Sequence, residues 1–279
     1  MAIAKSDFDF IVELVKARSG IVLDAGKEYL VECRLSMLMR QHKLSSLAAL
    51  VSRLRSNPAD PAFKQVVEAI TTHETSFFRD QYPFDALRNV VLPALLASRA
   101  VSKTLSIWCA ACSTGQEPYT IAMTLCEAIP KIEQWRITFI GTDICSDMIA
   151  RCRAGKFNQM EINRGLPAPL LAKYFDKRGA EWKIKRALRN MIEFRELNLV
   201  EKWSNLPPMD IIFMRNVLIY FNIETKQDIF KRLKGVLKSD GYLFLGAAET
   251  TMCVDEDFAR AEIDKGSYYH LSPANAAAA

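Results

Sequence analysis

The stretch Leu105-Ser-Ile-Trp-Cys109 and the residues after it, Ala110-Ala-Cys-Ser-Thr-Gly-Gln-Glu-Pro-Tyr119, decide the fold. The first five residues form a short apolar run, which is typical of a buried strand. The next residues are small and let the backbone approach a ligand, and Pro118 favours the start of a helix. Because Gly115 is the only glycine in the loop, the G-x-G-x-x-G spacing is missing and the nucleotide-binding signature is weak. The stretch predicts a strand, a tight loop and a helix, which is the repeating unit of a doubly wound sheet.

Strands and helices alternate through the rest of residues 103–279. Further strands are predicted at Arg136-Ile-Thr-Phe-Ile-Gly, Met191-Ile-Glu-Phe, Met209-Asp-Ile-Ile-Phe-Met and Tyr242-Leu-Phe-Leu-Gly, with Tyr268-Tyr-His-Leu as an additional edge strand. Helices are predicted at Pro118 to Ile129, from Asp147 onward, and at Glu224 to Lys238. This order predicts an α/β fold with a doubly wound, mostly parallel sheet.

The chain before about residue 104 shows helical patterns and no strand pattern. The predicted helices run from Ser6 to Gly20, from about 24 to 42, from Ser45 or Ser46 to just before Asn57, and onward from Asp60, which is read as a cap followed by Pro61. Residues 1–80 therefore predict a helical N-terminal domain. Residues 81–102 predict a linker helix that is broken near Pro93.

Two stretches of the chain are strongly basic. The first is residues 151–190, which hold eleven basic and three acidic side chains. Most of this stretch, residues 155–190, is too long for a single helix-to-strand loop and predicts a small inserted subdomain. Residues 33–59 hold five basic side chains and no acid, namely Arg34, Arg40, Lys43, Arg53 and Arg55. Two such patches favour an acidic macromolecular partner, with solvated helix or strand faces as the alternative.

The composition of the 279 residues is that of an ordinary globular protein. No apolar run reaches the roughly 18 residues of a membrane span, and residues 1–10 lack the apolar core of a signal peptide, so we expect a cytoplasmic protein. The seven cysteines then predict no disulfide framework. Cys109 and Cys112 have C-x-x-C spacing, for which packing in a tight loop is favoured over a redox pair or half of a zinc site. No metal site is expected.

Polar or aromatic groups follow the predicted strands, at the edge where doubly wound sheets bind ligands. Asp143 follows the second strand, in the place of an acid that accepts ribose hydroxyls. Asn198-Leu199 follows the third and suits the edge and face of an adenine, while Arg215-Asn216 and Tyr220-Phe221 follow the fourth. Each residue has an ordinary alternative: a helix cap for Asp143, a salt bridge for Arg215 and core packing for the aromatic pair. Their coincidence favours one ligand pocket.

Two other segments add candidate site residues. Glu117 stands at the start of a predicted helix, where it either interacts with the helix dipole or faces a cationic ligand. His73 and Thr75 lie in the polar and aromatic segment Thr71-Thr-His-Glu-Thr-Ser-Phe-Phe-Arg79-Asp, at the junction of the two predicted domains. Ordinary caps of a helix end are the alternative for this segment.

Three segments resemble the signature segments of CheR-type chemotaxis receptor methyltransferases. They are Thr72-His-Glu-Thr-Ser-Phe-Phe-Arg79, Ala110-Ala-Cys-Ser-Thr-Gly-Gln-Glu-Pro-Tyr119 and Arg215-Asn-Val-Leu-Ile-Tyr-Phe221. The resemblance covers nearly the whole chain. It implies a class I methyltransferase-like sheet, an all-helical N-terminal domain, and a small antiparallel β-subdomain as the insertion at about residues 155–190. Residues 103–279 would then be the catalytic domain.

The resemblance also implies the chemistry, which is methyl transfer from S-adenosylmethionine to receptor glutamates, giving glutamate methyl esters and S-adenosylhomocysteine. The implied cofactor-binding residues are His73, Thr75, Arg79, Glu117, Asp143, Asn198, Leu199, Arg215 and Asn216. His73 departs from the family pattern, which often has Asn there, and Gln116 stands where Glu is common. A glutamate with a pKa of about 4.3 is already ionised at neutral pH, so no general base is required. Arg79 could clamp that carboxylate and Tyr220 could donate a hydrogen bond.

The partner expected from this resemblance is the set of cytoplasmic helices of chemotaxis receptors. The basic residues of the stretch 33–59 would meet their acidic face. The short segment Asp176-Lys-Arg-Gly-Ala-Glu-Trp predicts that no C-terminal tether peptide is needed. Two alternatives stay open, an RNA methyltransferase and a non-catalytic S-adenosylmethionine-binding regulator. Nucleic acid is not expected as a partner, because Trp182 is the one well-placed aromatic residue in the basic insertion.

Overall fold

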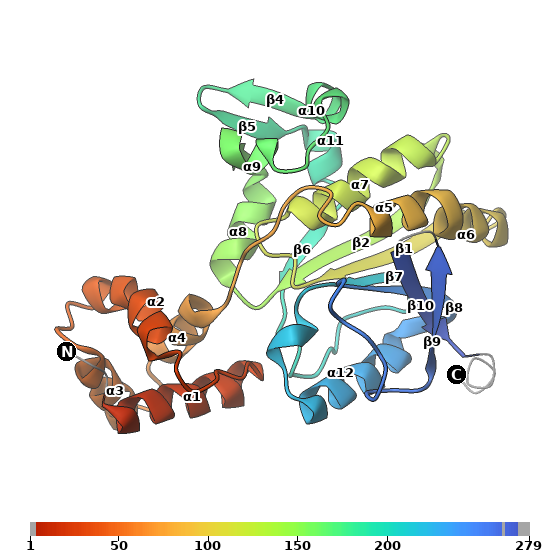
Figure 1. Cartoon of the computed structure of the whole chain (residues 1–279). Coiled ribbons are helices and arrows are strands. Elements are labelled where there is room, and N and C mark those ends of the chain that lie inside the picture. The colour runs from red at the N-terminus through yellow and green to blue at the C-terminus, as the bar shows by residue number, and fades with distance from the viewer. Residues whose placement is uncertain (1–3, 264–265, 273–279) are drawn as a thin grey trace.

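The computed structural model describes residues 4–263 and 266–272. Its N-terminal part consists of helices that pack around a hydrophobic core of their own (Figure 1). These helices are α1 (Lys5–Ser19), α2 (Glu28–Gln41), α3 (Leu47–Ser56) and α4 (Ala62–Ile70). Their apolar sides meet at fully buried residues such as Ile11, Leu35 and Leu50. The predicted helical domain is therefore present.

The ends of these helices differ in part from the predictions. Gly20 ends α1 in the left-handed conformation, as predicted, but α1 begins at Lys5 without a side-chain cap, so the predicted Ser6 cap is wrong. Ser46 caps α3 by accepting a hydrogen bond from the Ala49 N–H. Asp60 lies one residue farther out than predicted, yet its carboxylate still accepts from the Ala62 N–H at 2.8 Å.

A continuous helical segment connects this part to the sheet. It consists of α5 (Tyr82–Ala86), the π-helical turn η1 (Leu87–Val91) and α6 (Leu92–Ser98). The predicted break near Pro93 is wrong, because the helix passes through it. The Leu92 N–H bonds to the Leu87 carbonyl five residues back, and this wider turn directly precedes the proline that lacks an N–H.

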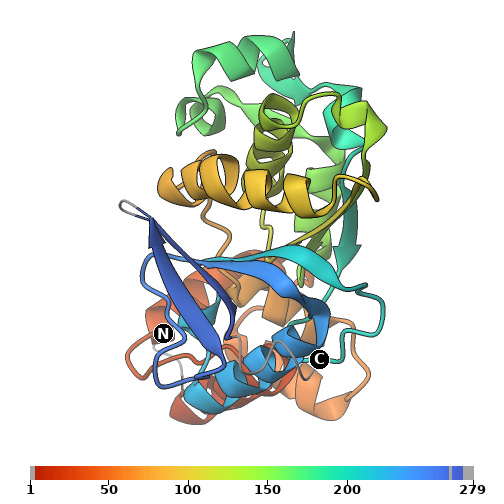
Figure 2. The same cartoon turned by 90° about the vertical axis from the view of Figure 1, so that its right-hand side faces the viewer.

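Within residues 4–263 and 266–272, the central sheet has seven strands in the order β6-β2-β1-β7-β8-β10-β9. Figure 2 shows the C-terminal strands of this sheet, in blue, on the side that faces the viewer. The parallel strands are β1 (Thr104–Ala110), β2 (Arg136–Asp143), β6 (Glu193–Glu196), β7 (Met209–Met214) and β8 (Leu237–Leu245). The strand β10 (Gly266–Leu271) is antiparallel to β8 and to β9 (Phe258–Ile263). The predicted doubly wound, mostly parallel sheet is confirmed, although β10 lies inside the sheet and not at its edge.

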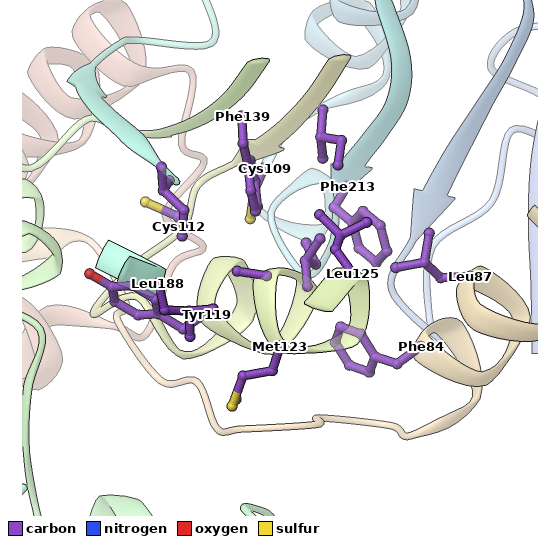
Figure 3. Packing of buried hydrophobic residues seen from close by; sticks show 14 of the residues in the cluster. Phe84, Leu87, Cys109, Cys112, Tyr119, Met123, Leu125, Phe139, Leu188 and Phe213 are labelled. Carbon is purple, nitrogen blue, oxygen red and sulfur yellow. The ribbon is translucent and has the colours of Figure 1, made fainter. Parts of the chain in front are cut away.

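Helices cover both faces of this sheet, as Figure 1 shows for α5, α6 and α7 (Gln116–Ala128) on one face and α12 (Ile223–Val236) on the other. The residues of β1 alternate between the two cores, so that Ile107 faces α7 and Trp108 faces the side of α12. Figure 3 shows Phe84 of α5 near Phe213 of β7, with ring centroids 5.9 Å apart. Burial of each such side chain stabilises the folded state by about 1.5–3 kcal/mol, so the sheet holds the loops at its ends in fixed positions.

The insertion after α8 (Ser146–Ala154) is a small antiparallel sheet, as predicted. Its strands in spatial order are β3 (Lys156–Asn158), β5 (Glu181–Ile184) and β4 (Phe175–Arg178). Short helices flank it, α9 (Gln159–Asn163), α10 (Ala168–Tyr174) and α11 (Arg186–Arg189). Phe157 and Phe175 pack edge-on against Phe77, at centroid distances of 5.0 and 5.8 Å. The insertion therefore braces the segment that contains the candidate residues 73–79.

The predicted domain limits, 1–80, 81–102 and 103–279, stay a prediction. Within residues 4–263 and 266–272, no helix combines the length and the apolar character that crossing a membrane would require.

Candidate functional site

One pocket lies beyond the carboxyl ends of β1, β2 and β7. The strand β1 pairs in parallel with both β2 and β7, so the chain connections diverge on either side of it, which is where doubly wound sheets bind ligands. The residues predicted from the sequence as site residues all line this pocket: His73, Thr75, Arg79, Glu117, Asp143, Asn198, Leu199, Arg215, Asn216 and Tyr220. The structure thus brings together residues from widely separated segments, and their individual roles stay predictions.

The loop after β1 is shaped around Asp143. Ala111, Ser113 and Gly115 have positive φ angles of 52°, 51° and 98°, which turn the backbone sharply between β1 and α7. The Ser113 N–H then donates to one oxygen of Asp143 at 2.8 Å, and the Cys145 N–H donates to the other at 2.9 Å. Burial raises the pKa of Asp143, while these backbone hydrogen bonds oppose the rise. A carboxylate has about four acceptor positions, so both oxygens can still accept hydroxyl groups from a ligand.

Arg215 is the buried cation of the pocket, with 1% of its side chain exposed. Its guanidinium bonds to Glu117 at 2.6 Å, to Asp80 at 2.8 Å and to the Arg79 carbonyl at 3.0 Å. Its Nε has no hydrogen-bond partner within the described ranges 4–263 and 266–272. A buried guanidinium N–H without a partner is costly, and an anionic or polar ligand group would satisfy it. Arg215 therefore does form salt bridges, as its ordinary alternative predicted, but they are buried and belong to the pocket.

The cysteines near this loop are buried thiols. Cys109 donates to Glu117 at 3.3 Å, and burial raises its pKa well above the ordinary value, so it stays protonated. Cys109 and Cys112 are both free thiols, and the Cys112 sulfur lies 3.8 Å from that of Cys152 in α8. In the part of the chain that the structure describes, no cluster of three or more His, Cys, Asp or Glu side chains could hold a metal ion.

The segment between the helical part and the sheet closes one side of the pocket. The His73 carbonyl accepts a hydrogen bond from the Ser113 hydroxyl at 2.7 Å, and the His73 ring lies 2.8 Å from the Thr71 hydroxyl. Arg79 donates from Nη1 to the Glu74 carbonyl at 3.0 Å. The backbone of residues 73–79 is therefore fixed against the loop after β1, with Thr75 and Arg79 on the pocket wall.

The helical part also contributes directly to the pocket, although no local sequence pattern predicts this. Ser19 and Ile21, at the end of α1, line the pocket. The Val22 N–H donates to the Tyr220 carbonyl at 2.9 Å, next to a bridge between Ile21 and Phe221. The Asn198 amide, predicted to face an adenine, donates to the Arg18 carbonyl at 2.7 Å. These contacts join residues about 180–200 positions apart, for which the sequence has no local signal.

The basic residues of the stretch 33–59 are not equivalent in the structure. Arg34 donates to the Thr71 carbonyl at 3.0 Å and to the Thr72 hydroxyl at 2.9 Å, so it supports the pocket segment. Arg53 pairs with the buried Asp60 at 2.7 Å, and Arg55 lies over the Phe10 ring at 4.9 Å. Arg40 and Lys43 are exposed at the C-terminal end of α2. Arg55 is exposed as well, but it lies over Phe10 and donates to the Ser6 carbonyl, so Arg40 and Lys43 are the better candidates for a partner contact.

Comparisons with known proteins agree with this architecture. Residues 73–267 match the family model described as "CheR methyltransferase, SAM binding domain", and residues 6–71 match "CheR methyltransferase, all-alpha domain". A "Chemotaxis protein methyltransferase Cher2" from Pseudomonas putida is 38% identical over 96% of this chain and 99% of its own. A "Chemotaxis protein methyltransferase 1" from Pseudomonas aeruginosa is 39% identical over the same shares, and one from Vibrio cholerae is 35% identical over 97% and 98%. The chain belongs to the CheR methyltransferase family.

Proposed function

We propose that this protein is a cytoplasmic protein-glutamate O-methyltransferase that uses S-adenosylmethionine to esterify glutamate side chains of chemotaxis receptors. The observation that carries the proposal is that Arg79 lines the same pocket as Glu117, Asp143 and Arg215. Membership of the CheR family supports the cofactor and the chemotactic role. The receptor glutamate as the acceptor is the proposed step.

The residues of the pocket fit the methyl donor. Asp143 offers acceptor positions for ribose hydroxyls, and the buried Leu199 offers an apolar surface for the adenine. The Nε of Arg215, which has no partner among the described residues, suits the carboxylate of the methionine part, and the carboxylate of Glu117 suits its cationic groups. When bound, S-adenosylmethionine supplies a methyl group on a sulfonium that a nucleophilic oxygen can displace.

The contribution of the protein is then orientation and not proton transfer. The acceptor glutamate is ionised at neutral pH, since its ordinary pKa is about 4.3. Arg79 donates one N–H to the Glu74 carbonyl, and its planar guanidinium group has further donors that can hold a carboxylate. Tyr220 is half-buried and lines the same pocket, where its hydroxyl can orient the acceptor. Correct placement of reacting groups accounts for several kcal/mol of a barrier.

Removal of the Arg79 side chain tests this role. We expect Arg79→Ala to lower receptor methylation by about a hundredfold or more, because the acceptor loses its clamp, and Tyr220→Phe to lower it by about tenfold. Base-labile methyl ester from labelled S-adenosylmethionine measures turnover, and calorimetry with S-adenosylhomocysteine measures binding. Arg260→Ala, at an exposed position of the edge strand β9, is the matched control and should change neither. Full activity of Arg79→Ala would remove Arg79 from the mechanism.

The same assay separates the proposal from its alternatives. Incubation of the protein with labelled S-adenosylmethionine and either receptor fragments or RNA reports the acceptor. Base-labile label on receptor fragments supports the proposal. Label on RNA would favour an RNA methyltransferase, and binding without transfer would favour a regulator.

We also propose that Arg40 and Lys43 contact the acidic face of receptor helices. Reversal of both charges, Arg40→Glu with Lys43→Glu, is expected to raise the KM for receptor fragments about tenfold and to leave kcat unchanged, because exposed charges act on encounter. The effect should shrink at high salt. Fragments without a C-terminal peptide serve as substrates here, because the short β4–β5 turn at Gly179 supports a tether-independent enzyme. Arg260→Glu is the control, and an unchanged KM would contradict the contact.

A further inference from the structure

Glu249 is a buried carboxylate that no sequence motif pointed to, in the loop that follows β8. Its exposed fraction is 8%, and it does not line the pocket. One of its oxygens accepts from the N–H groups of Asn216 at 2.8 Å and Gly246 at 2.7 Å. The other accepts from those of Val217 at 2.9 Å and Ile219 at 3.3 Å. A single side chain therefore organises the backbone of the whole segment between β7 and the 3-10 turn η3 (Leu218–Tyr220).

The segment held in this way has an unusual conformation. Asn216 has a positive φ of 57°, which a non-glycine residue adopts at some cost in energy. Consecutive N–H groups turned toward one point form an anion-binding concavity, and here the anion is the Glu249 side chain. Asn216 and Tyr220 line the pocket, whereas Glu249 does not. The carboxylate thus fixes the backbone of a segment whose residues line the pocket.

Gly246 shows how closely these groups are packed. A Cβ atom at this glycine would lie 2.7 Å from the Glu249 carboxylate, 2.8 Å from the Asn216 side-chain amide and 2.9 Å from the Asn216 backbone nitrogen. These distances are far below ordinary contacts, so the site requires a residue without a side chain. The glycine and the glutamate form one unit that is built to receive the Asn216 backbone.

We infer that Glu249 is a positioning residue for methyl transfer, which fixes the backbone of residues 216–219 so that Asn216 and Tyr220 hold the methyl donor and acceptor in line. The inference rests on the proposed function where methylation is measured, whereas its structural part can be tested without that function. It adds a residue outside the pocket to those that determine how the pocket residues Asn216 and Tyr220 are placed. The Glu249 carboxylate acts through the backbone, not through contact with the reacting atoms.

The isosteric variant Glu249→Gln tests the inference, because it keeps the shape and replaces one accepting oxygen by an NH₂ group. Hydrogen exchange of the ligand-free protein is expected to accelerate about tenfold or more in residues 215–220, since bonds to a charged acceptor are lost there. Exchange in β1 and β2 should not change. In the methylation assay kcat should fall about tenfold or more, while the KM for receptor fragments stays the same. Gly246→Ala, which retains the glutamate but displaces Asn216, should show the same pattern.

Glu256→Gln, at an exposed position of the same loop region, is the matched control and should leave exchange and kcat unchanged. Unchanged exchange in residues 215–220 of Glu249→Gln would overturn the inference, whatever the activity. Faster exchange throughout the sheet would also overturn it, because the residue would then serve general stability. If no variant and not even the natural chain methylates receptors, the proposed function fails, while the exchange data and the affinity for S-adenosylhomocysteine still decide the role of Glu249.

Discussion

Replacement of Arg215 by methionine is expected to lower the affinity for S-adenosylhomocysteine about a hundredfold or more and to destabilise the protein by about 3–5 kcal/mol. The side chain is 1% exposed and pairs with Glu117 and Asp80. Methionine fills a similar volume but leaves the Glu117 carboxylate inside the pocket without its partner. An uncompensated buried charge is what makes such a replacement costly.

Calorimetry with S-adenosylhomocysteine and urea unfolding measure the two effects. The double variant Glu117→Gln/Arg215→Met is the informative control, because it removes both charges and should recover part of the stability but not the affinity. Arg260→Met, on the exposed edge strand, should behave like the natural protein. An affinity of Arg215→Met within about threefold of the natural value would show that the ion pair is not part of the ligand site.

Replacement of Asp210 by alanine is expected to destabilise the protein by about 3–5 kcal/mol without altering ligand affinity in the folded molecules. Asp210 is fully buried near the start of β7, at the end of the sheet away from the pocket. It pairs with Arg99 at 2.9 Å and with Lys238 at 2.8 Å, and it accepts from the Ser106 N–H at 2.7 Å. These contacts fasten the linker helix and β8 to the centre of the sheet, so their loss should lower the urea midpoint.

The contribution of Asp210 should also depend on pH. Burial raises its pKa, but the hydrogen bonds from Lys238 and Ser106 outweigh burial, so the pKa is lowered overall. A carboxyl group whose pKa is lower in the folded state stabilises the protein above the unfolded pKa, which is about 3.9, and loses this effect as the pH falls through the folded value. The stability difference between the natural protein and Asp210→Asn should therefore shrink when urea unfolding is measured below about pH 4. A difference that grows at low pH would contradict this assignment.

The parts of the site that the sequence predicted are those with a local pattern. Asp143 and Arg215 each end an apolar strand, and parallel strands bring their carboxyl ends to one edge. Ser19, Ile21 and Glu249 have no such pattern, because their places depend on how distant segments dock. From the sequence, Glu249 is an ordinary acidic residue of a loop, and only the structure shows its hydrogen bonds to four backbone N–H groups.

The fold was predictable to the same degree and for the same reason. The buried strands are continuous apolar runs, whereas β9 (Phe258–Ile263) contains Arg260 and Glu262 and reads as solvent-exposed chain. The helix predicted to end at Lys238 ends at Val236, because Leu237 already begins β8 by pairing with Met209. Pairing partners far along the chain set this boundary, and local propensity does not contain that information.

Because Ser19 and Ile21 line the pocket together with Tyr220, while Glu249 fixes the backbone before Tyr220, the pocket is complete only when the end of α1 lies against the segment after β7. A chain under synthesis can form the helices α1 to α4 early, but it can bind the methyl donor only after residues 215–249 have also left the ribosome. Proteolytic fragments that lack either α1 or the segment after β7 should therefore not bind the cofactor. Cofactor binding, in turn, adds its free energy to the contact between these two parts, so a bound cofactor marks a chain in which both are folded.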